Sequence, residues 1–135
     1  MRGAGRSALV LAAGVLLAPL ASGEAAAQAL SPMRGKVTSA SDSFMLRVRP
    51  FNPYAKRMKM AVRVYDAKFR PIRALVSPSR FGIAARGTRN VSVRVPFAGK
   101  ARRRVRVCVE AMPYTAVNTR LRTRVCGKFI ASRLR

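Results

Sequence analysis

The feature of this sequence that most constrains its fold is a strict alternation of apolar and polar residues with a period of two. The alternation is clearest in residues 43–49, 58–65, 90–95 and 104–111, where an apolar residue occupies every second position. Successive side chains of a β-strand point to opposite faces, so a half-buried strand has this period and an amphipathic helix does not. The sequence therefore predicts an all-β fold in which each strand turns one apolar face toward a core.

Further extended pieces lie between and around these four segments. They are residues 33–37, 72–76, 81–83 and 121–131. Clusters of Pro, Gly, Asn and Asp separate neighbouring pieces and mark the turns. We expect about seven short strands, the pattern typical of a β-sandwich. Pro71 and Pro78 indicate that the pieces beside them are edge strands, because proline lacks the N–H that a central strand needs.

The two cysteines allow the pairing of the last two strands to be predicted. In an antiparallel hairpin that places Cys108 opposite Cys126, the valines of both strands share the inward face. Glu110 then faces Arg124. Both cysteines lie on the outward, arginine-rich face, where free thiols would be exposed to an oxidising compartment. We therefore expect a cross-strand disulfide, and the alternative is a pair of free buried thiols.

Residues 1–29 have the layout of a secretory signal peptide. Two arginines precede an apolar run at 8–20, and small residues at 25–29 offer a cleavage site. The run is shorter than the roughly 20 apolar residues that span a bilayer, which disfavours the alternative of a membrane anchor. The sequence thus predicts an exported bacterial protein, periplasmic or secreted, whose mature domain is residues 30–135 and has no transmembrane segment.

The composition excludes most catalytic chemistry. The chain contains no histidine, two cysteines and four acidic residues, one of them in the leader. Without histidine there is no Ser-His-Asp or Cys-His nucleophile, and two cysteines cannot close a tetrahedral zinc site. The remaining carboxylates, of Asp42, Asp66 and Glu110, lie in unrelated contexts, whereas glycosidases and aspartic proteases need two placed together. We expect no enzymatic activity, no cofactor and no metal.

The chain carries a large positive charge, with 28 Lys and Arg against 4 Asp and Glu and a formal net charge of +24. The hairpin register gathers some of these cations on one outward face, as candidate residues for binding an anion or a partner: Arg104, Arg106, Arg122, Arg124 and Lys128. Solubility needs a net charge of only about 2 to 8, so the excess favours an anionic ligand such as an envelope polymer or lipid head groups. Nucleic acid is disfavoured as the primary ligand, because the compartment is wrong and the outward positions lack interleaved aromatics for base stacking. A solvated basic face without a ligand is the alternative.

Four motifs follow one another in a characteristic order. RVRPFNP at 47–53 precedes an alternating strand, VSPSRFGI occupies 76–83, and a turn at Gly87 leads into VSVRV at 91–95. In this order the chain, from about residue 33 to 131, resembles the N-terminal immunoglobulin-like domain of the PapD-like periplasmic pilus chaperones. The resemblance implies an immunoglobulin-like β-sandwich. It also implies a function, because such chaperones lend an edge strand to an exported pilus subunit and hold the subunit's terminal carboxylate with basic residues.

The sequence departs from that family in two respects. The chain ends at Arg135, so we expect the family's second domain to be absent, and no residue is assigned to carboxylate binding. The strand best placed for donation is 121–129, but the expected disulfide ties it to its neighbour, and Arg122 and Arg124 interrupt its outer face. Two hypotheses remain. One is a chaperone-like module that binds another envelope or secreted protein; the other is a cationic module that binds anionic polymers, lipids or nucleic acid through the arginine-rich hairpin.

Overall fold

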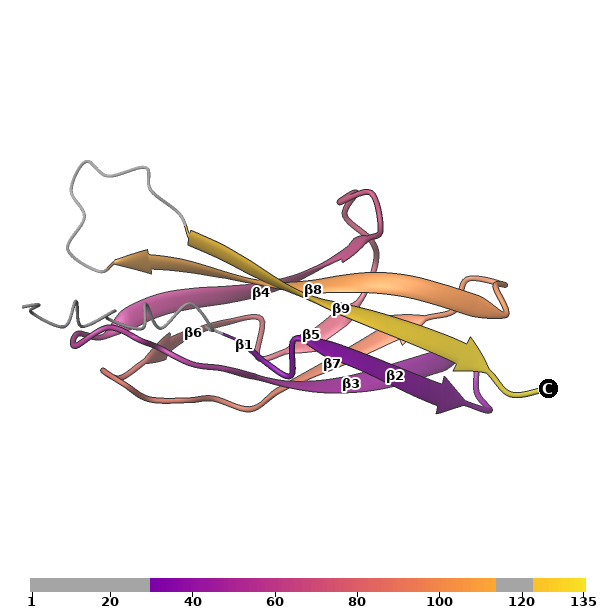
Figure 1. The fold of residues 1–135 in the computed structure, drawn as a ribbon, viewed down its shortest axis with the longest axis horizontal. Coiled ribbons are helices and arrows are strands. Elements are labelled where there is room, and N and C mark those ends of the chain that lie inside the picture. The colour runs from indigo at the N-terminus through magenta and orange to yellow at the C-terminus, as the bar shows by residue number, and fades with distance from the viewer. Residues whose placement is uncertain (1–29, 114–122) are drawn as a thin grey trace, which may run out of the picture.

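The computed structural model describes residues 30–113 and 123–135, so the predicted signal peptide and the tip of the last hairpin lie outside the described residues. Figure 1 shows the described residues as two layers of β-sheet. The strand order is β1-β3-β7-β5 in one sheet and β2-β9-β8-β4-β6 in the other. The strands are β1 (Leu30–Ser31), β2 (Arg34–Ser39), β3 (Ser43–Pro50), β4 (Met58–Asp66), β5 (Leu75–Ser77), β6 (Arg80–Ile83), β7 (Val91–Pro96), β8 (Arg102–Pro113) and β9 (Thr123–Arg133).

The predicted all-β sandwich is confirmed, with nine strands in the described residues in place of about seven. The alternation did not indicate β1, because this strand is only two residues long and forms by pairing with β3, Leu30 opposite Pro50. The pieces expected at 72–76 and 81–83 correspond to β5 and β6, which are edge strands as predicted. Within the two described ranges, no helix has the length and hydropathy needed to cross a membrane.

The core lies between the sheets and consists mainly of the inward positions of the predicted alternation. The buried inward residues of the long strands are Phe44, Leu46, Val48, Met58, Met60, Val62, Val64, Val91, Val93, Val95, Val105, Val107, Val109 and Ala111. Phe97 was not expected among them, because it lies in the loop after β7. Its side chain is fully buried, and its ring centroid lies 5.0 Å from that of Phe44. A loop residue therefore contributes to the core, where burying an aromatic ring of this size stabilises by roughly 1.5–3 kcal/mol.

The first described segment passes from one sheet to the other. β1 pairs with β3 in the four-stranded sheet, and only Pro32 and Met33 separate it from β2, which pairs in parallel with β9 in the five-stranded sheet. The pairing of β2 with β9 starts at Arg34 opposite Lys128 and continues to the end of both strands. β9 therefore has neighbouring strands on both sides over its C-terminal half. Over its N-terminal half, the described residues provide a neighbour, β8, on one side only.

Candidate binding surfaces

The first candidate surface is the side of β9 that faces away from β8 over residues 123–127, which we call the free edge. Within the described ranges these residues pair with β8 alone, because β2 begins only at the level of Lys128. Figure 1 shows β2 alongside the C-terminal half of β9 only. A sheet edge of this kind presents unpaired N–H and C=O groups and is a template for pairing with another chain. The strand that we expected to be donated, 121–129, is therefore an edge strand over its described residues before Lys128. From Lys128 onward it is covered by β2.

The ladder between β8 and β9 shows which backbone groups face the free edge. The Cα atoms of Cys108 and Cys126 are 4.0 Å apart, the close spacing of an antiparallel pair that is not hydrogen-bonded. The N–H and C=O groups of Cys126, and by the period of two those of Arg124, therefore point away from β8. Lys128 follows the same pattern, since its N–H donates to the carbonyl of Met33 at 2.8 Å. A strand laid along the free edge would meet the backbone groups of Arg124 and Cys126.

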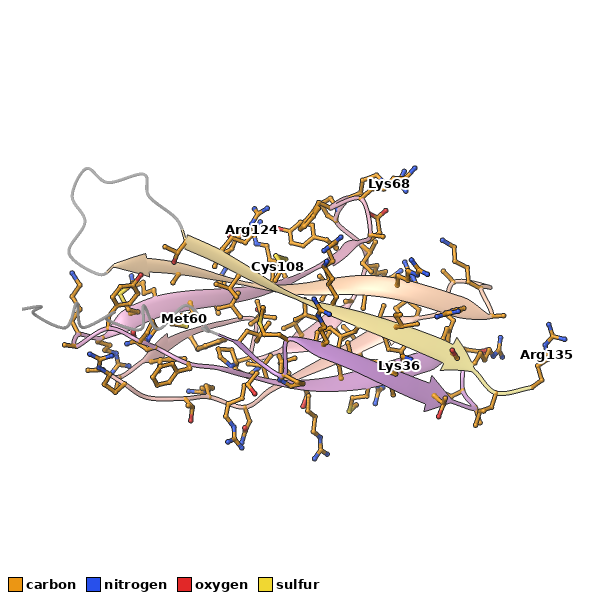
Figure 2. The ribbon with its side chains drawn as sticks, viewed as in Figure 1. Lys36, Met60, Lys68, Cys108, Arg124 and Arg135 are labelled. Carbon is orange, nitrogen blue, oxygen red and sulfur yellow. A yellow bond between two sulfur atoms is a disulfide. The ribbon has the colours of Figure 1, made fainter. Side chains whose placement is uncertain are left out.

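The predicted disulfide between Cys108 and Cys126 is confirmed, together with the predicted register of the hairpin, in which Glu110 faces Arg124. The bond joins β8 to β9, so it leaves the opposite side of β9 open (Figure 2). The expected exposure of the cysteines is wrong for Cys108, which is fully buried. Arg63 of β4 lies opposite Cys108 on one side and Cys126 lies opposite it on the other, so neighbours in the sheet cover the sulfur.

A polar cluster around Glu110 lies on the outward face beside the free edge. Glu110 is only 5% exposed, and its Oε1 accepts hydrogen bonds from the Tyr65 hydroxyl at 3.3 Å and from Nη2 of Arg124 at 3.0 Å. Arg63 Nε lies 4.0 Å from Oε2, and the Arg124 guanidinium lies 5.3 Å from the centroid of the Tyr65 ring. Tyr65 lies on the same outward face and is buried beside these partners. The cluster neutralises Glu110 and engages Arg124.

The predicted cationic face of the hairpin can be compared with the structure for four of its five residues, since Arg122 lies outside the described residues. The four occupy outward positions of β8 and β9: Arg104, Arg106, Arg124 and Lys128. Arg106 is engaged, because its Nε donates to the carbonyl of Ala67 at 3.3 Å and its guanidinium lies 4.4 Å from the centroid of the Phe69 ring. The side chains of Arg104 and Lys128, by contrast, form no hydrogen bond or ion pair with any residue that the structure describes.

Two further cations, which the sequence analysis missed, join this face from β2. Arg34 lies opposite Lys128, and Lys36 lies opposite Ile130. Both are exposed, and neither side chain has a hydrogen-bonding or ionic partner among residues 30–113 and 123–135. The signal that could have revealed them is weak, because β2 and β9 are far apart in the chain and pair in parallel. A local pattern of residues says nothing about such a pairing.

The carboxylates of the described residues are all paired with arginines. Asp42 binds Arg133, Asp66 binds Arg70 with 2.7 Å between Oδ2 and Nε, and Glu110 binds Arg124. No group of three or more His, Cys, Asp or Glu side chains in the described ranges is arranged to hold a metal ion. None of these carboxylates therefore pairs with the cations Arg34, Lys36, Arg104, Arg106 and Lys128.

The turn after β4 borders the cationic face and is organised by Asp66. Its Oδ1 accepts hydrogen bonds from the backbone N–H groups of Lys68 at 2.8 Å and Arg70 at 2.9 Å. The hydrogen bond from the Arg70 backbone contributes most to lowering the pKa of Asp66 below its ordinary value of 3.8, and the Arg70 side chain and the Lys68 backbone add to it. Phe69, with a left-handed φ of 59°, is held in place to contact Arg106.

This lowered pKa predicts how the turn responds to pH. Because the folded pKa lies below the unfolded one, the carboxylate stabilises the turn above the ordinary pKa, and this contribution is lost as the pH falls through the folded value. We expect the amide resonances of Lys68 and Arg70 to titrate in NMR spectra with a midpoint below 3.8. Asp66→Asn should abolish this titration. A midpoint at or above the ordinary value would contradict the assignment.

The arrangement of the strands defines the class of fold. Two sheets enclose one core, antiparallel except for the parallel pairing of β2 with β9, and the first described segment passes from one sheet to the other. The last two strands form a long hairpin. This is the architecture of an immunoglobulin-like β-sandwich.

No protein-family model and no curated protein matches this chain. The SafB chaperone of Salmonella enterica, in its complex with the SafA pilin, matches with a TM-score of 0.63 and 19% identity, covering 77% of this chain and 53% of that one. The E. coli chaperone DraB gives 0.61 and 20%, covering 77% and 54%. SSP-19, an MSP-domain protein like family member in Caenorhabditis elegans, gives 0.58 and 12%, covering 78% and 99%. The chain spans about half the length of these chaperones, and likeness at such identities shows the fold, which confirms the predicted resemblance.

Proposed function

We propose that this chain is an exported, non-enzymatic, chaperone-like module of the bacterial periplasm that binds another envelope or secreted protein by accepting a strand along the free edge of β9. The observation that carries the proposal is that edge, where among the described residues β9 pairs with β8 alone before Lys128. Two of the matching structures are complexes of a chaperone with a pilus subunit, SafB with SafA and CsuC with CsuE. Strand addition is a recognition mode in which main-chain hydrogen bonds supply affinity and alternate side chains supply specificity.

The inward positions along β9 support this mode of binding. Val125 is half-buried against the core, Gly127 and Phe129 are buried, and Thr123 is exposed. A Cβ added at Gly127 would lie 2.8 Å from Cε2 of Phe129, so the position has no room for a side chain. An added strand would therefore meet a small residue at Gly127 and an apolar, half-buried side chain at Val125 along the inward side of β9.

Two cations mark the point where such a strand would end. Arg34 and Lys128 lie opposite each other where β2 begins, in line with the position that an added strand would occupy. A partner strand running parallel to β9 would bring its C-terminal end to this pair. Charge-assisted hydrogen bonds from two cations suit a terminal carboxylate, and we assign Arg34 and Lys128 to that role in the proposed complex.

Arg124→Pro tests the proposal, because it removes an N–H that faces the free edge and takes no part in the ladder to β8. Arg124→Gln is the matched control, since it removes the same charge and keeps the N–H. In capture from periplasmic extract at about 1 M NaCl, where the Debye length is about 3 Å, we expect the wild type and the Gln variant to retain one defined protein. The Pro variant should retain at least about tenfold less, because main-chain pairing is lost.

Hydrogen exchange locates the contact. The amide of Cys126 faces the free edge, so its exchange should slow in the captured complex. Loss of all bound protein at high salt, or equal capture by the Pro variant and the wild type, would refute strand addition.

A further inference from the structure

A hollow of about 230 Å³ lies on the outward face of the five-stranded sheet, next to the turn after β4. Arg104 and Arg106 of β8 and Lys128 of β9 supply its cationic lining, and Ala67 and Ile130 supply part of its apolar lining. In the sheet, Arg106 lies opposite Lys128 and Arg104 lies opposite Ile130. Cations of the two adjacent strands β8 and β9 therefore line the hollow, which opens to solvent on the side of the sheet away from the core.

The cationic field continues from this hollow across β9 onto β2. Arg34 follows Lys128 in one row across the sheet, and Lys36 follows Ile130 in the next row. Neighbouring strands are about 4.8 Å apart, and alternate residues of one strand are about 6.8 Å apart, so these side chains lie close together. We call this set of six outward residues the grid: Arg34, Lys36, Arg104, Arg106, Lys128 and Ile130. Figure 2 shows Lys36 on β2 at the outer part of this sheet. The described side-chain carboxylates form ion pairs with arginines outside the grid. The positive charges of the grid are therefore not neutralised by them, and their electrostatic potential attracts anions.

The chemistry of the face discriminates between anionic ligands. Insertion into a bilayer needs several exposed large apolar side chains. Ile130 in this face is half-buried, and the neighbouring Phe69, 46% exposed, contacts the Arg106 guanidinium. Base stacking needs open aromatic faces, whereas Arg106 packs on Phe69 and Tyr65 is buried. Arginine guanidinium groups match phosphate oxygens in a bidentate geometry. Several cations on a shallow surface, without a deep enclosed pocket, suit a linear polymer better than a single small anion.

We propose that this hollow and the adjoining cations of β2 form a binding site for a linear phosphate polymer, with inorganic polyphosphate as its simplest representative. Arg104, Arg106 and Lys128 hold phosphate groups in the hollow, and Lys36 extends the contact onto β2. The site lies on the outward face of the sheet, whereas the strand-addition site lies along the edge of β9. Arg34 and Lys128 border both sites, so the variants that test the phosphate site leave these two residues unchanged.

The test compares two double variants of equal charge in the purified, oxidised protein. Lys36→Gln with Arg104→Gln removes two exposed cations of the site, and Lys100→Gln with Arg94→Gln removes two exposed cations from elsewhere on the molecule. Titration with medium-chain inorganic polyphosphate at about 0.15 M NaCl should show affinity at least about tenfold weaker for the site variant and less than about twofold weaker for the control. The slope of log affinity against log salt should fall by about two for the site variant.

Three outcomes would overturn the proposal. Equal losses in both variants would mean that binding follows net charge alone. Equal or tighter binding of single-stranded DNA, of anionic lipid vesicles or of polyglutamate, lost in the same variant, would assign the face to a different ligand. If the protein does not bind polyphosphate at physiological salt, the proposed site does not exist. Arg124→Pro should leave polyphosphate affinity unchanged, so failure of strand addition and failure of this site give different results.

Discussion

Replacing Asn52 with aspartate should lower the free energy of unfolding by about 3 to 5 kcal/mol, because it points a buried charge at carbonyl oxygens. Asn52 is fully buried. Its Nδ2 lies 2.8 Å from the carbonyl oxygen of Lys56, 3.2 Å from that of Ile83 and 3.0 Å from that of Ala84, and its Oδ1 accepts from the N–H of Tyr54 at 3.0 Å. The side-chain amide of Asn52 therefore links the loop after β3 to the end of β6 and the turn that follows it, through hydrogen bonds to their carbonyl oxygens.

Aspartate has nearly the shape of asparagine, so the Asn52→Asp substitution removes the donor and adds a charge without changing the packing volume. At neutral pH the introduced carboxylate would face three carbonyl oxygens without a hydrogen to offer. A loss of this size is a large part of the roughly 5–15 kcal/mol by which a domain of this kind is stable. Equilibrium unfolding in urea, followed by far-UV circular dichroism, measures it.

Two controls make the result specific. Asn52→Ala should cost less, about 2 kcal/mol, because it leaves buried carbonyls unsatisfied without adding a charge. The Asp variant should recover stability as the pH falls, since a protonated carboxyl can donate one hydrogen bond again. Equal stability of the Asp variant and the wild type at neutral pH would show that the amide is not the donor at this site.

Removing the disulfide, with Cys108→Ala and Cys126→Ala together, should lower the free energy of unfolding by about 3 kcal/mol, as estimated from the loop entropy of the unfolded chain. The two cysteines are 18 positions apart, so the bond closes a loop of moderate length around the hairpin tip. Alanine avoids placing a hydroxyl at the buried site of Cys108. Urea unfolding of the double variant gives the loss directly.

Reduction of the wild type provides the matching measurement without mutation. Unfolding in the presence of a thiol reductant should shift the midpoint toward that of the double alanine variant. The reductant should leave the double variant unaffected. An unchanged midpoint in the reduced wild type would mean that the cross-link contributes nothing to stability, contrary to the loop-entropy argument.

The sequence predicted the strands and their faces well, because both depend on neighbouring residues. Val105, Val107 and Val109 alternate with polar residues, and all three are buried. The register of the last hairpin was also predictable, since Cys108 and Cys126 lie on strands that follow each other in the chain and had one consistent pairing. Periodicity and a single cross-link were enough for these features.

Features that depend on distant pairing were missed or only partly predicted. Leu30 is buried because it pairs with β3, and Phe97 because its loop folds back over Phe44. Arg34 and Lys36 join the cationic face because β2 lies beside β9. The hairpin cations were identified in advance, yet the engagement of Arg106 with the turn after β4 could not be predicted, because that contact crosses between segments with no pattern in common.

The sequence by itself determined that this protein is a β-sandwich with an alternating core and a cross-linked last hairpin, because a period of two and a pair of cysteines act over short stretches of chain. Only the tertiary structure decided which part of β9 is covered and which is open. That boundary depends on where the first described segment leaves one sheet for the other, between β1 and β2. It is set by the packing of strands far apart in the chain, and so the edge proposed to bind a partner follows from the fold.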